Sequence, residues 1–261
     1  MLGITSALYD ACQYKHDIHR ASGVQPSHWY KFDEVTASLG GPPTAGDTFP
    51  TGANVNVLLS AGTSSIPITA VSGTPQIDTT SMHRNCIAYD GTDDANLIAA
   101  SPISTTSKAG AILVVFKKSD GNNDVLISET DTDANGSFGI KLTGANNANV
   151  SMRMGSSYGT AKTFGLTNNI TPGQDAMLLI IRNSAGHTFI HTQNGLEVQN
   201  TANSDVLDMP KFGPIQRFGG AASADYTGMI GEFAMWNQHL DDAQAAAVIA
   251  SIREKWNLSD L

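Results

Sequence analysis

The sequence predicts an all-β fold, an antiparallel jelly-roll sandwich with a short C-terminal helix and an N-terminal helical arm. From residue 85 onward, short apolar segments recur and are separated by turns rich in Gly, Asn and Asp, as in antiparallel sandwiches. The 25 Gly and 10 Pro among 261 residues, with 15% charged residues, also favour many short strands. Near the C-terminus, the spacing of apolar residues changes from that of a strand to that of a helix.

Charge and composition narrow the class of protein. The net charge of −9, without a cluster of Lys and Arg, argues against binding to nucleic acid. The N-terminus lacks the regions of a signal peptide, and no apolar run approaches the length of a membrane span. We therefore expect a soluble protein made in a cytoplasm. Cys12 and Cys86 are too few for a disulfide framework and are expected to be reduced thiols.

Residues 1–25 are predicted to form the N-terminal helical arm. The helical candidate runs from Ile4 to Arg20 with a weak apolar face, and Gly23 and Pro26 end it. The arm either packs on its own domain or is held out for a partner, and the sequence leaves both alternatives open.

Residues 26–261 are predicted to form the sandwich, with a Gly/Pro/Thr-rich excursion at about residues 36–84. A structureless loop of this length is improbable in a compact domain, so we expect a peripheral hairpin or a segment that extends across a neighbour. Ordering such segments costs backbone entropy. We expect neighbouring subunits to supply the surface that buries the excursion and the arm.

The regular strands follow in order. They are predicted at His28–Glu34, Cys86–Tyr89, Leu97–Ala100, Ile112–Phe116, Val125–Ser128, Phe138–Leu142, Val150–Met154, Met177–Ile181, Thr188–Thr192, Leu196–Gln199 and Ile215–Gly219. Ile112–Phe116 and Met177–Ile181 are wholly apolar, which predicts central strands covered on both faces. Asn194-Gly195 is a strong hairpin signal between two of the strands.

The chain closes with a strand and a helix between Tyr226 and Trp256. Apolar residues on both faces predict a strand that is covered on both sides. Alternation places Met229, Phe233 and Met235 on one face and Ile230, Ala234 and Trp236 on the other. Asp241 and Gln244 form a capping box, after which Ala245, Val248, Ile249, Ile252 and Trp256 give the helix one buried stripe.

Residues 88–94 read Ala-Tyr-Asp-Gly-Thr-Asp-Asp, residues 177–195 end in Thr-Phe-Ile-His-Thr-Gln-Asn-Gly, and residues 226–256 form the closing element. Together these stretches resemble the concanavalin A-like lectin/glucanase jelly rolls in their laminin-G-like form, over about residues 85–257. The resemblance implies the fold, but this fold carries lectins, hydrolases and adhesion modules alike.

A chain of this kind with an unusual N-terminal arm, no signal peptide and a Lys-Trp-Asn end also resembles phage virion proteins. That resemblance implies a non-enzymatic virion component, a head decoration or a tail or collar protein, which docks on other virion proteins or on identical subunits. The alternative is a carbohydrate-binding, lectin-like module that recognises host or environmental glycans.

Asp131, Asp133 and Asn135, followed by Gly136, match the first half of a calcium loop, in which alternating oxygen ligands converge on one cation. The twelfth position of such a loop is Leu142, so the bidentate Glu of an EF-hand is absent. A looser calcium site and a solvated turn between two strands both stay open.

Catalytic constellations are incomplete, and the chain is predicted not to be an enzyme. Glu129, Asp131 and Asp133 resemble part of the Glu-x-Asp-x-x-Glu signature of jelly-roll glucanases, but the final Glu is absent. Glu232 stands alone in the closing strand and is predicted to be a hydrogen-bonded structural residue. His187 and His191 share a face of a predicted strand, but without a third ligand they predict no zinc site.

Sugar binding needs aromatic platforms beside Asn or Asp at the rim of a loop. The available candidates are Tyr158, Asn146–Asn147 and Asp225–Tyr226. Turn chemistry or core packing explains each of them equally well, so the sequence assigns no sugar-binding residue.

Overall fold

The computed structural model describes residues 17–32, 36–37, 55–57, 60–64, 66–72, 75–91, 96–121, 124–129, 138–153, 162–200, 211–220 and 226–261. Within these ranges, the strands form two large sheets, which share one hydrophobic core, and a small ribbon. The pairings between these strands are antiparallel, so the predicted all-β jelly-roll sandwich is confirmed. The small ribbon pairs β2 (Thr36–Ala37) with β3 (Val55–Val57).

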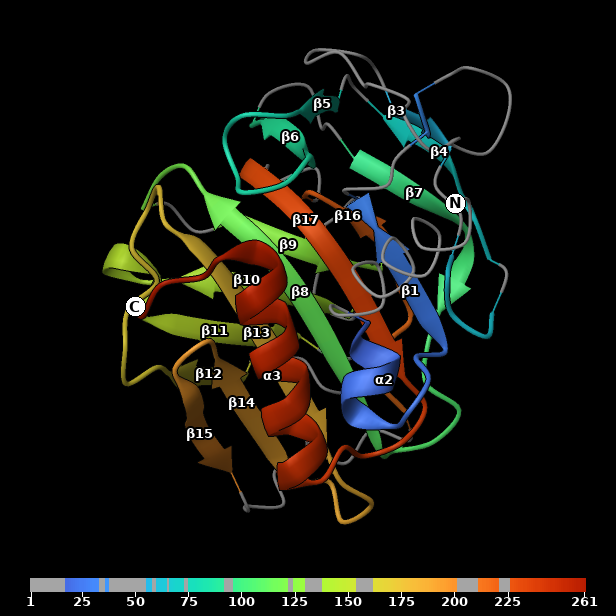
Figure 1. The fold of residues 1–261 in the computed structure, drawn as a ribbon, viewed down its shortest axis with the longest axis vertical. Coiled ribbons are helices and arrows are strands. Elements are labelled where there is room, and N and C mark those ends of the chain that lie inside the picture. Colours follow the sequence, from blue (N-terminus) through green and yellow to red (C-terminus); the bar gives the residue numbers. More distant parts are fainter. Residues whose placement is uncertain are drawn as a thin grey trace, which may run out of the picture.

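The sheet that lies between the helices and the second sheet is here called the middle sheet (Figure 1). Its strand order is β15-β14-β13-β8-β17-β6-β5, and β1 also pairs with β17. The strands are β1 (His28–Lys31), β5 (Gln76–Asp78), β6 (Cys86–Asp90), β8 (Gly110–Lys118), β13 (Asp175–Arg182), β14 (Thr188–Thr192), β15 (Gly195–Asn200) and β17 (Thr227–Trp236). The predicted central strands correspond to β8 and β13, which are apolar along most of their length because both of their faces are covered.

The second sheet, here called the outer sheet, has the order β12-β11-β10-β9-β16-β7-β4. Its strands are β4 (Ile68–Ser72), β7 (Asn96–Ile103), β9 (Asp124–Ser128), β10 (Gly139–Thr143), β11 (Asn149–Arg153), β12 (Lys162–Gly165) and β16 (Ile215–Phe218). The one-turn helix η2 (Ala145–Asn147) connects β10 to β11.

The core between the two sheets consists of side chains that alternate along the strands. Phe116 of β8 and Leu142 of β10 are fully buried there, and the rings of Tyr30, Phe218 and Phe233 pack with centroids 5.0–6.1 Å apart. Burying a side chain of this size stabilises the fold by about 1.5–3 kcal/mol.

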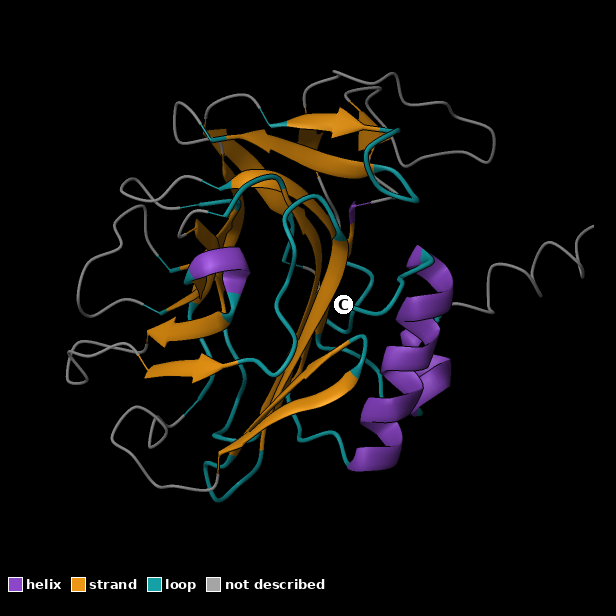
Figure 2. Ribbon diagram, turned by 90° about the vertical axis from the view of Figure 1, so that its left-hand side faces the viewer, coloured by secondary structure: helices purple, strands orange, loops and turns teal. Residues whose placement is uncertain are grey.

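Two helices, α2 (Ile18–Ser22) and α3 (Asp242–Trp256), lie on the same side of the molecule and cover the other face of the middle sheet (Figure 2). The predicted capping box is confirmed, because Asp241 accepts from the Gln244 N–H and the Gln244 side chain accepts from the Asp241 N–H. The predicted stripe of α3 is buried as well, and Trp256 is 0% exposed. The helix therefore docks as the sequence predicts.

The described end of the N-terminal arm packs on its own domain. Asp17 caps α2, Gly23 ends it with a φ of 70°, and Ile18 is 0% exposed in the cluster beneath α3. Residues 1–16 lie outside the described part of the chain, so the arm as a whole stays a prediction.

The predicted face assignment in β17 is wrong for its first half. A β-bulge lies between Ile230 and Glu232, where the register against β8 shifts by one residue. A bulge reverses which face each residue on one side of it occupies. Ile230 therefore joins Phe233 in the core between the sheets, whereas Met229 lies with Ala234 on the helix side.

The expectation that neighbours must bury the excursion is wrong for its described part. Ile68 of β4 and Ile77 of β5 are each 1% exposed in the core between the sheets, so these strands extend the sandwich itself. Residues 60–64 follow the free edge of β1, where the Ala61 N–H donates to the Trp29 carbonyl at 2.7 Å. Such bonds satisfy an edge strand that would otherwise be open.

Candidate functional site

Glu232 lies at the bulge of β17 and is completely buried beneath α3. Trp29 Nε1 donates to its Oε1 at 2.6 Å, while Trp256 Nε1 and Lys255 Nζ donate to its Oε2 at 2.9 and 2.7 Å. A Cβ on Gly231 would come within 2.3 Å of the Trp256 ring, so glycine is required for this approach. Glu232 is thus the hydrogen-bonded structural residue that the sequence predicts.

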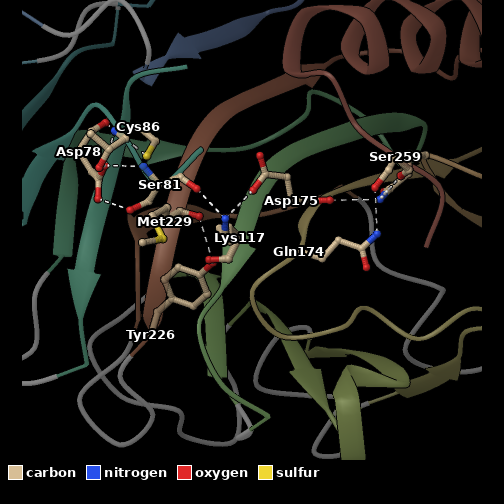
Figure 3. A network of polar contacts seen from close by, with 11 residues as sticks. Asp78, Ser81, Cys86, Lys117, Gln174, Asp175, Tyr226, Met229 and Ser259 are labelled. Carbon is tan, nitrogen blue, oxygen red and sulfur yellow. Dashed lines mark hydrogen bonds and ion pairs between the residues drawn. The ribbon is translucent and has the colours of Figure 1, made fainter. Parts of the chain in front are cut away.

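A second polar network surrounds Lys117, on the helix side of β8 (Figure 3). Lys117 Nζ donates to the Ser81 carbonyl at 2.6 Å and lies 3.3 Å from the Asp175 carboxylate. Burial, together with the nearby Asp78 and Asp175 charges, raises the pKa of the free Cys86 thiol to about 12. A thiol with this pKa stays protonated at neutral pH and is a poor nucleophile. The network holds the segment between β5 and β6 against the sheet.

The partial glucanase signature coincides with a hairpin between β9 and β10. Glu129 Oε2 accepts from the Phe138 N–H at 3.0 Å, and the Glu129 N–H donates to the Phe138 carbonyl at 2.8 Å. Glu129 therefore closes the base of the hairpin. Asp131, Asp133 and Asn135 lie outside the described residues, so the calcium site and the paired carboxylates stay predictions.

His187 and His191 are separated by the start of β14, because His187 precedes the strand and His191 lies within it. Burial lowers the pKa of His191, and the Asp242 charge opposes this effect only in part. Among the described residues, no three His, Cys, Asp or Glu side chains come together as a metal site.

Of the sugar-binding candidates, the structure describes Asn146, Asn147 and Tyr226, and among these three only Asn146 is exposed. Tyr226 is 0% exposed, and its hydroxyl donates within the fold to the carbonyls of Lys117 and Met229. Asn147 is also 0% exposed and donates to the Ile170 carbonyl at 3.2 Å. Tyr226 and Asn147 are therefore buried structural residues, which is the alternative that the sequence left open, and Asn146 stays a candidate. Tyr158 and Asp225 lie outside the described residues.

The outward face of the outer sheet is a different kind of surface. Ile140 and Leu142 of β10 point into the core, so Lys141 between them faces outward. Ser151 of β11 is the register partner of Lys141, and Thr163 of β12 is the partner of Ser151. The hydroxyls of Ser151 and Thr163 lie 3.4 Å apart. These three residues form one polar row across three strands.

A neighbouring row runs through β16, β9 and β10. Phe218 and Ile127 are partners within the core, so the adjacent pair Arg217 and Ser128 faces outward. Ser128 is also the partner of Gly139. Ser128 and Ser151 are buried, Lys141 and Arg217 are half-buried, and Thr163 is exposed. We call Ser128, Lys141, Ser151, Thr163 and Arg217 the outer polar face.

The charge of the outer sheet is opposite to that of the chain. Its strands contain four basic residues, Lys141, Arg153, Lys162 and Arg217, and one acidic residue, Asp124, whereas the net charge of the chain is −9. Asp124 does not belong to the outer polar face, because it pairs at 2.8 Å with the fully buried Lys118 of the middle sheet.

Hydroxyl, ammonium and guanidinium groups are therefore gathered on one side of the sandwich. Hydroxyls donate and accept hydrogen bonds, and the two cationic groups donate several each. Within this set, the exposed hydroxyl of Thr163 is the group best placed to meet a polar ligand, whereas Ser128 and Ser151 are buried and Ser128 donates to the Gly220 carbonyl at 3.0 Å. The sequence contains a signal for this set, the alternation in residues 138–142, but which strands are neighbours appears only in the fold.

No protein-family model and no curated protein sequence matches this chain. Solved structures, in contrast, do match this chain. The binding domain of botulinum neurotoxin serotype D superposes with a TM-score of 0.60 at 12% identity, over 87% of this chain and 51% of that chain. A structure of botulinum neurotoxin type C, whose cell entry depends on two ganglioside molecules, gives 0.59 at 10% identity, over 90% and 53%.

A third match covers a whole domain. Domain 4 of AbnA, an extracellular GH43 arabinanase from Geobacillus stearothermophilus, in complex with arabinotriose, has a TM-score of 0.55 at 15% identity, over 86% of this chain and 98% of that domain. The chain thus spans about half the length of the neurotoxin structures. At these identities the matches show the fold: it is that of β-sandwich binding domains.

The described helices are too short or too polar to cross a membrane.

Proposed function

We propose that this chain is a non-enzymatic carbohydrate-binding module that holds its glycan on the outer polar face. The observation that carries the proposal is the polar row of Lys141, Ser151 and Thr163 on the sheet face opposite the helices. The helix-covered face offers no comparable surface in its described part, because Trp256 and its neighbours are packed under α3.

The similar structures support this proposal. AbnA domain 4 binds arabinotriose, and cell entry of botulinum neurotoxin type C depends on gangliosides. Both share the sandwich with this chain, and the first is matched over nearly its full length. Because one fold can carry several functions, the residues of the outer polar face have to support the glycan independently.

A glycan array probed with the full chain tests the proposal, followed by isothermal titration against the best sugars. We expect a small group of related glycans to bind. Glycan binding should weaken in Thr163→Glu, which places a bulky charged side chain in the polar row, and should persist in Ser184→Glu, an exposed position in the turn after β13. An array without any bound glycan would contradict the function.

The phage virion component stays a prediction that rests on sequence resemblance alone. Size-exclusion chromatography of the same preparation addresses it, because a decoration or tail protein is expected to assemble with identical subunits or other virion proteins. A glycan-binding monomer would favour the module, whereas a stable oligomer without glycan binding would favour the virion role.

A further inference from the structure

We infer that the chain has a second sugar site, which takes a neutral sugar and lies beside α3 on the middle sheet. The site consists of Phe189, Leu196, Gln199, His239 and Asp242, and we call it the aromatic ledge. This inference rests on the proposed carbohydrate-binding function, but it does not depend on the outer polar face, which is on the opposite side of the sandwich.

The last two strands of the middle sheet carry the aromatic ledge. β15 ends the strand order, and it extends beyond the edge of α3 (Figure 1). Ile190 of β14 points into the core between the sheets, so Phe189 and His191 on either side of it face the helix side. Cross-strand partners share a face, which places Gln199 beside Phe189 and Leu196 beside His191.

A change of register turns Leu196 toward the aromatic ledge. Val198 packs against the core between the sheets, and in a regular strand Leu196, two residues away, would face the same way. The shift between Ile190 and His191 reverses its direction. Leu196 is therefore 52% exposed, and it is a diagonal neighbour of Phe189, within reach of that ring.

Two aromatic rings meet at the aromatic ledge. His239 belongs to the segment between β17 and α3, and its ring packs edge-on against Phe189 with the centroids 6.3 Å apart. Both residues are half-buried. The electron-rich face of an aromatic ring attracts the slightly positive C–H groups of a sugar ring. The pair is thus an aromatic platform of the kind that the sequence analysis could not assign.

The polar groups of the aromatic ledge are available to a ligand. Within the described part of the chain, the side chains of Gln199, His239 and Asp242 make no hydrogen bond or ion pair. Asp242 lies close enough to His191 for its charge to act on that ring, which places it near Leu196. A carboxylate accepts hydrogen bonds, and an amide both donates and accepts them, so sugar hydroxyls find both kinds of partner.

The size of the aromatic ledge favours a sugar over a protein. One strand spacing across and two residues along the strands measure about 5 by 7 Å, which is the scale of a single sugar ring. A stable protein interface buries about 800 Å² on each partner. Among the described residues, Leu196 alone is a large apolar side chain that is exposed, so the apolar area is small for a second copy of the chain.

Charge selects among the sugars. Asp241 and Asp242 are both exposed in the first turn of α3, and the net charge of the chain is −9. These carboxylates repel an acidic sugar and accept hydrogen bonds from the hydroxyls of a neutral one. The aromatic ledge therefore suits a neutral sugar.

Titration calorimetry on the full chain tests the inference with three sugars. Lactose and arabinotriose are the neutral probes, and sialyllactose is the acidic counterpart of lactose. We expect at least one neutral probe to bind, and sialyllactose to bind no more tightly than lactose. Tighter binding of sialyllactose would overturn the neutral class. Failure of both neutral probes, and of the neutral glycans on the array, would overturn the aromatic ledge.

Variants locate the site. Phe189→Leu removes the ring and should weaken binding of the neutral sugar about fivefold, and Phe189→Tyr should weaken it less. Gln199→Ala should weaken binding about two- to tenfold, as for one lost hydrogen bond. Gln76→Ala is the matched control, because Gln76 is an exposed glutamine on β5, at the other end of the same sheet, and it should leave binding unchanged.

Thermal melting verifies that each variant is folded. If Phe189→Leu does not fold, Leu196→Asp places a charge on the aromatic ledge at an exposed position, and it should weaken binding at least as strongly. Unchanged affinity in Leu196→Asp and Gln199→Ala would overturn the assignment to the aromatic ledge.

The variants also separate this inference from the proposed function. Two sugars per chain, one lost in Leu196→Asp and the other in Thr163→Glu, is the expected result. Binding that is lost in Thr163→Glu and unchanged in Leu196→Asp overturns the aromatic ledge and leaves the proposed function in place. Binding that is lost in Leu196→Asp and unchanged in Thr163→Glu supports the aromatic ledge and overturns the outer polar face. A chain that binds no glycan at all removes both.

Discussion

The helix-covered face of the middle sheet and the outward face of the outer sheet differ in how deeply their polar groups are buried. Beneath α3, both carboxylate oxygens of Glu232 accept hydrogen bonds from fully or nearly fully buried partners. On the outer polar face, Thr163 is exposed and Lys141 and Arg217 are half-buried. A buried charge must be paired to be tolerated, whereas a charge that remains near water can interact with a ligand. We therefore expect stability to depend on the packing of the helix side, and the proposed glycan binding to depend on the outer polar face.

Removal of the Trp256 side chain should have the largest effect on the stability of the helix side. The residue is 0% exposed, covers Gly231 and donates to Glu232. Trp256→Ala should lower the free energy of unfolding by about 3–5 kcal/mol, because a large cavity and a lost hydrogen bond combine. Urea unfolding measures the change. A melting temperature that shifts by only a degree or two would mean that α3 is not docked firmly.

Loss of the Lys255 ammonium, which pairs with the buried Glu232 carboxylate, should have the second-largest effect on stability. Lys255→Met removes the ammonium that pairs with the Glu232 carboxylate and leaves the two indole donors in place, which should cost about 3 kcal/mol. The double variant Lys255→Met, Glu232→Gln removes the charge as well and should recover part of this loss. If the double variant is less stable than Lys255→Met alone, the ion pair is not what makes Lys255 important.

The sequence predicts the closing helix more accurately than the strand before it. Spacing and capping chemistry identify α3 because both are local, and Asp241 with Gln244 forms the predicted box. Alternation in β17 fails at Gly231, since a bulge depends on the neighbouring strand β8 and on the Trp256 ring. Neither neighbour is visible from the alternation of residues 227–236.

The hairpin between β14 and β15 is also predicted only in part, because its register depends on the pairing of the two strands. Asn194-Gly195 predicts a turn, and the turn exists, but Thr192 pairs with Gly195, so the two connecting residues are Gln193 and Asn194. Gly195 has a φ of 105° and begins β15. Local chemistry thus identifies the hairpin, and the register decides which residues form the loop.

The candidate site could not be predicted because its residues are scattered. Arg217 is more than seventy residues from Lys141, and antiparallel pairing through β9 brings them to one face. The sequence offers Tyr226 as one of several candidates and leaves core packing open for it, and its aromatic ring is in the core. Composition signals a sugar-binding type of residue, but only strand order shows which of these residues face solvent.

Acidification should affect stability through two buried histidines, His191 on the helix side and His28 on the face of β1 that carries Tyr30. Burial lowers the pKa of His28 and of His191 below the ordinary value, with Asp242 partly opposing the shift at His191. The unfolded chain therefore binds protons first, so stability is fully present above about pH 6.5 and declines as the pH falls toward the folded pKa values. Urea unfolding at pH 8 and pH 5.5 measures this decline.

A control variant sharpens the pH prediction. His191→Gln should reduce the dependence on pH between these two values, because one of the two histidines that resist protonation is gone. Asp124 contributes in the opposite direction, because burial raises the pKa of its carboxyl despite the opposing Lys118. An unchanged pH profile in His191→Gln would show that His191 is not a source of the dependence.

The smallest effect on stability is expected at Thr163, where the comparison can be tested without disturbing the core. Thr163→Val keeps the branched shape that suits edge strand β12 and removes a hydroxyl whose bond to Ser151 is long, at 3.4 Å. The free energy of unfolding should therefore change by less than about 0.5 kcal/mol, as for most surface substitutions.

Affinity of Thr163→Val for the glycan identified on the array should nevertheless fall severalfold, because the hydroxyl is a proposed ligand group of the outer polar face. Chemical unfolding and titration calorimetry on the same preparation measure both quantities. A loss of more than about 1 kcal/mol of stability with unchanged affinity would reverse the assignment, since Thr163 would then support the sheet and not the sugar.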